Sequence, residues 1–169
     1  MGTLPAPEPW DISAYALGPV SAETPFDLEA LSALLPGYTL TEAPSPDGSP
    51  FREILAAAPH AQEPGLVFLG HAETPNITGV RVREAGRIPN AWLIGSAFSQ
   101  TLFKPDDCFT ASDVPGREGD IFAREAGELT APVYWFRTGL ADTNGVLPDA
   151  ETLGASTLYE ISWVAWSRT

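Results

Sequence analysis

Cysteine is almost absent from this chain, since Cys108 is the single cysteine among 169 residues. One cysteine excludes an intrachain disulfide and a cysteine-based zinc cluster. Its neighbours Asp106 and Asp107 are acidic and would raise the pKa of the thiol, whereas a catalytic thiolate needs a basic neighbour that lowers it. The sequence therefore favours a small, half-buried apolar role for Cys108 over nucleophilic catalysis.

Positive charge is also scarce: nine lysine and arginine residues face 22 aspartate and glutamate residues, and the formal net charge is −13. No dense basic patch can neutralise phosphates, so the composition argues against binding to nucleic acid or to an anionic membrane surface. No apolar run approaches the roughly 18 residues of a transmembrane segment. Residues 1–10 lack the basic and apolar regions of a signal peptide.

Recognisable catalytic and ligand-binding motifs are missing as well. His60 and His71 have no further ligands at zinc-site spacing, and the chain has no glycine-rich phosphate loop, so we expect no metal and no cofactor. Ser96 lacks the second glycine of a nucleophile elbow. The acidic segment 106–128 is interpreted as a solvated loop, with weak binding of a divalent cation as the alternative.

The chain does contain enough apolar residues for one domain, because 44% of the sequence is hydrophobic. Prolines alternate through the first nine residues, so we expect a flexible tail over 1–10 and a single domain over 11–169. Apolar alternation and short connections predict an antiparallel meander. The predicted strands cover 12–20, 38–43, 51–58, 66–71, 77–86, 133–136 and 157–166. The segment 51–58 also fits a short helix.

Helices are predicted at three places. The clearest has Thr24 as its N-cap and Pro25 at its first position, and Pro36-Gly37 ends it. Its apolar face consists of Leu28, Leu31, Leu34 and Leu35. Shorter helices are expected over 96–103 and 147–153. We therefore expect an α+β fold, mainly antiparallel sheet with two or three short helices packed on it.

Aromatic residues are the remaining candidates for function. The chain has five tryptophans, most of which we expect in the core. Trp92, just before the turn at Ile94-Gly95, and Phe109, inside the acidic segment, are the candidate partner-binding residues. If both are exposed and close together, they form an apolar patch with an acidic rim, suited to a protein or cationic envelope partner. If both are buried, they form no binding site.

Structural landmarks follow one another in a characteristic order along the chain. They are Gly18-Pro19, Thr24-Pro25-Phe26-Asp27, Pro36-Gly37, Ile94-Gly95, Cys108, Tyr134-Trp135-Phe136, Leu147-Pro148 and Ile161-Ser162-Trp163. This order resembles a bacterial family of uncharacterised envelope proteins that includes RpoE-regulated lipoproteins. The resemblance covers residues 18–166, nearly the whole predicted domain, and rests on caps, turns and core aromatics.

The resemblance implies a domain outside the cytoplasm that is tethered through a lipidated N-terminal cysteine after signal cleavage. This chain departs from that pattern because it has no signal or lipobox cysteine, so we interpret Met1-Gly2 as a replacement start. Family members tend to carry a second cysteine after the position of Cys108. The region 121–123 has none, so no family disulfide is implied here. The family has no established catalytic residues to transfer.

Together these observations predict a non-catalytic, periplasmic accessory or binding domain derived from a lipoprotein, whose partner is an unknown envelope protein or ligand. One alternative is a small hydrolase-like enzyme with an unrecognised site. The other is a cytoplasmic regulator, which would follow if the natural gene starts at Met1.

Overall fold

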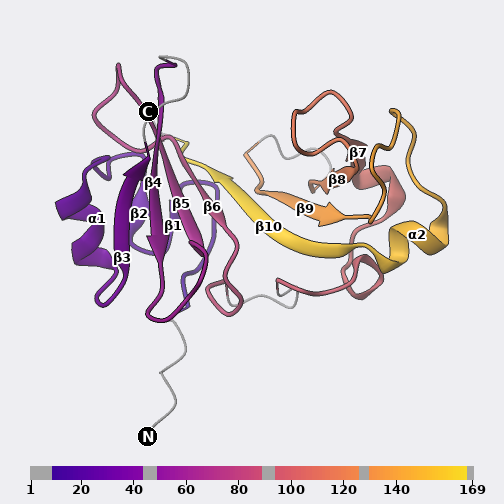
Figure 1. Cartoon of the computed structure of the whole chain (residues 1–169), viewed down its shortest axis with the longest axis horizontal. Helices are drawn as coiled ribbons and strands as arrows, with labels where there is room; N and C mark the ends of the chain where they lie inside the picture. The colour runs from indigo at the N-terminus through magenta and orange to yellow at the C-terminus, as the bar shows by residue number, and fades with distance from the viewer. Residues whose placement is uncertain (1–8, 44–48, 89–93, 126–129, 167–169) are drawn as a thin grey trace, which may run out of the picture. The chain divides into compact units, whose positions relative to one another are not determined.

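The computed structural model describes residues 9–43, 49–88, 94–125 and 130–166. The chain divides into two compact units: unit 1 comprises Met1–Pro89 and Trp163–Thr169, and unit 2 comprises Asn90–Ser162. Figure 1 shows the helices and strands in chain order. The last strand, β10 (Thr157–Val164), contributes residues to both units.

Unit 1 begins with a small hairpin of β1 (Ala16–Leu17) and β2 (Val20–Ser21), where one long strand was predicted over 12–20. The chain turns at Gly18, whose φ of +55° is unfavourable for other residues. The Trp10 side chain packs directly on this glycine, and a Cβ atom at Gly18 would lie 2.4 Å from the indole Cγ. Trp10 is consequently only 5% exposed.

Helix α1 (Leu28–Leu34) starts three residues later than a cap at Thr24 would place it. Asp27 is the N-cap, and its carboxylate accepts a hydrogen bond from the backbone amide of Ala30 at 2.9 Å. The predicted cap is therefore wrong: Thr24 accepts a backbone hydrogen bond in the preceding turn instead. Leu31 is fully buried, which confirms the centre of the predicted apolar face.

The predicted antiparallel meander is confirmed in unit 1. It consists of β3 (Thr39–Ala43), β4 (Phe51–Ala57), β5 (Leu66–His71) and β6 (Gly79–Val82), each paired with the next. Residues 51–57 thus form a strand and not the alternative helix. In Figure 1 the four strands lie side by side and α1 lies next to β3. Fully buried side chains of this unit include Leu31, Ile54, Leu66, Phe68, Val80 and Trp163.

Unit 2 contains β7 (Cys108–Thr110), β8 (Asp120–Ala123), β9 (Val133–Arg137) and most of β10. Within unit 2 the strand order is β10-β9-β8-β7, so β7 is an edge strand. The solvated loop predicted over 106–128 is corrected here, because β7 and β8 fall inside it. Side chains alternate between the two faces: Tyr134 and Phe136 are buried, whereas Trp135 between them points to the other face.

The expected α+β class is wrong, because the described part of the chain is mainly β-structure. Its α-helices are α1, with seven residues, and α2 (Ala150–Ala155), with six. The segment predicted as a helix over 96–103 holds only the 3₁₀ turn η2 (Phe98–Gln100), followed by the 3₁₀ turn η3 (Pro105–Asp107). Ala97 pairs instead with Thr157 of β10, which fixes extended backbone just before η2. None of the described helices has the length and apolar character needed to cross a membrane.

Candidate functional site

Three aromatic side chains lie next to one another on one face of the unit 2 sheet. Phe109 on β7 is opposite Phe122 on β8, which is opposite Trp135 on β9. The rings of Phe109 and Phe122 are stacked, with centroids 5.2 Å apart and planes at 21°. The rings of Phe122 and Trp135 are 5.0 Å apart and tilted by 46°. We call these three residues the aromatic row.

The outer end of the aromatic row is open to solvent. Phe109 is 50% exposed, although one face of its ring is stacked on Phe122. It lies on the edge strand, so no further strand of the sheet continues the row beyond it in the described part of the chain. Trp92, the other residue of the predicted patch, lies outside the described residues. A patch formed by Trp92 and Phe109 together therefore stays a prediction.

The inner end of the aromatic row is covered by an arginine. The guanidinium carbon of Arg117 lies 4.0 Å from the centroid of the Trp135 ring, which is a cation–π contact. The same guanidinium donates a hydrogen bond of 2.7 Å from Nη2 to Glu160 Oε2. The Glu160 side chain is fully buried and the Arg117 side chain is 15% exposed. Arg117 therefore provides the positive charge that a buried carboxylate needs.

A β-bulge explains how Arg117 reaches two consecutive residues of β10. The pairing register between β9 and β10 shifts between Leu158 and Glu160, which inserts Tyr159 as an extra residue. Arg117 Nη1 donates to the Tyr159 hydroxyl at 2.9 Å, and this hydroxyl donates to the carboxylate of Asp120. Burial, together with the hydrogen bond to Asp120, raises the pKa of Tyr159. The tyrosine therefore stays a neutral donor.

Sequence reasoning missed Arg117 and Glu160. Arg117 lies in an acidic segment, and its partner is 43 residues away in sequence, so no local spacing connects the two. The sequence does contain one sign that Glu160 has a charged partner, because Glu160 lies between apolar neighbours in a predicted strand. A charged residue at such a position needs a partner of opposite charge.

Cys108 belongs to the opposite face of β7 from Phe109. It is 8% exposed, and its Sγ donates a weak hydrogen bond to the Lys104 carbonyl at 3.5 Å. Burial raises the pKa of the Cys108 thiol to about 12, and the negative charge of Asp107 adds to the rise. The thiol is consequently protonated near neutral pH, as its acidic neighbours predicted.

The polar groups beneath the aromatic row are engaged with one another, whereas the outer ring surface is open. Among the described residues, no group of three or more His, Cys, Asp or Glu side chains is placed to hold a metal ion. His71 is engaged locally, since its Nδ1 accepts the backbone amide of Glu73 at 3.1 Å. The exposed ring of Phe109, stacked on Phe122, is the part of the aromatic row that is open to contact.

Neither a family model nor a curated protein matches the chain. Among solved structures, the fold is similar to that of the uncharacterized protein yfeY from Escherichia coli, with a TM-score of 0.69 and 19% sequence identity. The similarity covers 93% of this chain and 99% of that one. At this level of identity the comparison shows a shared fold.

Proposed function

We propose that this chain is a non-catalytic binding domain and that Phe109, at the outer end of the aromatic row, anchors its partner. The observation that carries the proposal is the 50% exposure of a phenylalanine whose ring is already fixed by stacking on Phe122. A ring held in place before binding loses little conformational entropy when a partner covers it. Aromatic anchors of this kind supply much of the energy of protein interfaces.

The net negative charge of the chain indicates which kind of partner it attracts. The net charge of −13 attracts basic partners and repels acidic ones during encounter. A partner with an apolar side chain flanked by lysine or arginine fits both the exposed ring and the negative charge. Because Phe109 lies on an edge strand, an extended segment of such a partner could also pair with the β7 backbone.

The cellular location is part of the same proposal. We place the domain outside the cytoplasm, as the mature part of a periplasmic lipoprotein, on the strength of the sequence resemblance to RpoE-regulated envelope lipoproteins. Fractionation of cells that express the natural gene, combined with labelling by a radioactive fatty acid, tests this location. Recovery of unlabelled protein in the cytoplasmic fraction alone would overturn it.

The binding role is tested by replacing Phe109 with alanine. We expect Phe109→Ala to reduce recovery of cross-linked partners by about tenfold, as truncation of an interface anchor does. Phe51→Ala is the matched control, because Phe51 is 66% exposed but lies on β4 of unit 1. Equal recovery with wild-type protein and both variants would overturn the proposal.

A further inference from the structure

A pocket of about 300 Å³ lies within unit 2, on the face of the sheet opposite the aromatic row. Tyr134, which lines it, precedes Trp135 on β9, and consecutive side chains of a strand point to opposite faces. The pocket is therefore separate from the surface to which the binding function was assigned. Its lining consists of Leu102, Phe103, Asp107, Glu125, Ala131, Pro132 and Tyr134.

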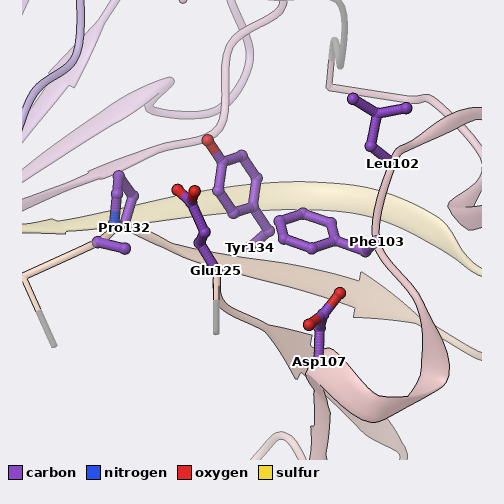
Figure 2. A pocket seen from close by; sticks show the side chains of 7 residues that line it. Leu102, Phe103, Asp107, Glu125, Pro132 and Tyr134 are labelled. Carbon is purple, nitrogen blue, oxygen red and sulfur yellow. The ribbon is translucent and has the colours of Figure 1, made fainter. Parts of the chain in front are cut away.

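Two aromatic rings form the wall of this pocket. Figure 2 shows the rings of Phe103 and Tyr134 side by side. Their centroids are 5.1 Å apart and their planes are tilted by 56°. Tyr134 is only 6% exposed, so the wall is anchored in the core of unit 2. Such a wall offers an apolar surface and the negative ring faces that attract cations.

Two carboxylates border the aromatic wall, and the described residues of the lining include no lysine or arginine. In Figure 2 the Glu125 carboxylate lies beside the Tyr134 ring and the Asp107 carboxylate lies below the Phe103 ring. Asp107 is held in place, because its Oδ2 accepts the backbone amide of Lys104 at 2.9 Å. Glu125 is exposed and lies beside the aromatic wall.

We infer that this pocket binds a small organic cation, an ammonium ion attached to an aromatic or other apolar body. The ammonium group would pair with Glu125 and Asp107, and the apolar body would lie against Phe103 and Tyr134. An anion of the same shape would meet two like charges. The volume of about 300 Å³ is at the small end of ligand pockets, which limits the occupant to one small molecule.

The inference is tested with three probes that share one skeleton: 2-phenylethylamine, 2-phenylethanol and 3-phenylpropionate. Each is titrated into the full chain at low ionic strength and followed by the amide NMR signals of Phe103 and Tyr134. We expect the amine to bind at least about tenfold more tightly than the carboxylate, because opposite charges replace like charges. The alcohol should fall between them.

Charge variants test the role of the two carboxylates. Glu125→Gln should weaken amine binding by roughly three- to fivefold, as loss of an exposed charge pair does, and leave alcohol binding unchanged. Asp107→Asn keeps an oxygen for the Lys104 amide and should add to this loss. Glu63→Gln is the control, because it removes the same charge from unit 1.

Three outcomes would overturn the inference. The first is equal affinity for the amine and the carboxylate. The second is amine binding that Glu125→Gln and Glu63→Gln weaken equally, which would indicate only an effect of net charge. The third is no saturable shift of the Phe103 and Tyr134 signals by any probe. Phe109→Ala should leave amine binding unchanged, so failure here is distinguishable from failure of the proposed partner surface.

Discussion

The two units contain the same set of interacting side chains, an arginine with a glutamate, a tyrosine and a tryptophan. In unit 1, Arg87 donates to Glu84 at 2.7 Å and to the Tyr38 hydroxyl at 2.6 Å, and its guanidinium carbon lies 4.6 Å from the centroid of the Trp10 ring. We call these four residues the unit 1 arginine cluster. Arg117, Glu160, Tyr159 and Trp135 form the unit 2 arginine cluster.

The two clusters differ in what their tryptophan side chains contact. In unit 1 the Tyr38 hydroxyl donates a hydrogen bond to Glu84, which belongs to the same cluster. Trp10 is buried against Gly18. In unit 2 the Tyr159 hydroxyl donates to Asp120, which lies outside the cluster, and the Trp135 ring contacts the Phe122 ring. The same chemistry thus fixes a core tryptophan in unit 1 and supports, in unit 2, a row of rings whose outer end is exposed. This difference supports the proposal that the binding surface lies in unit 2.

The largest expected effect comes from removing each arginine. Arg117→Ala should lower the free energy of unfolding by about 3–5 kcal/mol, because it leaves a carboxylate unpaired in the interior. Arg87→Ala should cost less, about 2–3 kcal/mol, since the Glu84 side chain is 12% exposed and keeps the Tyr38 hydrogen bonds. Urea unfolding followed by circular dichroism measures both.

A double variant separates lost charge pairing from lost packing. Arg117→Met keeps similar volume but leaves Glu160 unpaired, and adding Glu160→Gln removes the second charge, so the double variant should recover at least half of the stability that Arg117→Met loses. Equal losses for Arg117→Met and the double variant would mean that the contacts of the guanidinium, and not the unpaired charge, dominate. A larger loss for Arg87→Ala than for Arg117→Ala would contradict the comparison of the two clusters.

The pKa shifts of Tyr38 and Tyr159 predict that the protein loses stability at alkaline pH. Burial and the neighbouring carboxylates raise the pKa of both Tyr38 and Tyr159, with the larger rise at Tyr159. A raised folded-state pKa stabilises the fold fully below the unfolded-state value of about 10, and this contribution is lost as the pH rises above it. Stability should therefore fall between pH 10 and pH 11.5.

Phenylalanine variants show which tyrosine causes that fall. Tyr159→Phe should reduce the loss of stability at pH 11 by about 1 kcal/mol relative to wild type, and Tyr38→Phe should reduce it less. Unfolding in urea at pH 8 and pH 11 of wild type and both variants gives the six values needed. The contribution of Cys108 is common to both variants and cancels in the comparison. Identical pH dependence of the two variants would show that the clusters are equivalent.

The smallest effect is expected at Cys108, which tests the contrast between the two faces of β7. Cys108→Ser should fold normally, and its free energy of unfolding should change by about 1 kcal/mol or less, because serine is similar in size to cysteine. In the native protein the thiol should react slowly with a thiol reagent at neutral pH, because burial raises its pKa to about 12. If the thiol of Cys108 reacts as fast in native as in unfolded protein, this face of β7 is open to solvent.

Local sequence patterns predicted the unit 1 meander well. Apolar alternation and flanking turn residues placed the strand at Leu66–His71 with its observed bounds, and β4 differs from its prediction by one residue. These strands are buried against their neighbours, so the period of their side chains carries the information. The same reasoning failed for 96–103, because the pairing of Ala97 with the distant Thr157 overrides helical spacing.

The candidate site was predictable only at its exposed end. Phe109 could be selected because a large apolar residue in an acidic segment is unusual. The support beneath it depends on contacts between strands and on the pairing of Arg117 with Glu160, which are distant in sequence. The bulge at Tyr159 has no sequence signal of its own, and it decides which side chains reach the arginine.

Site-specific photo-cross-linking tests most directly the claim that unit 2 carries the binding surface. A photoreactive phenylalanine analogue is placed at position 109 in one variant and at position 51 in another, and both are irradiated in cells that express the natural partner set. The account predicts a discrete adduct from position 109 and none from position 51. An adduct from position 51 alone, or none from either position, would contradict it.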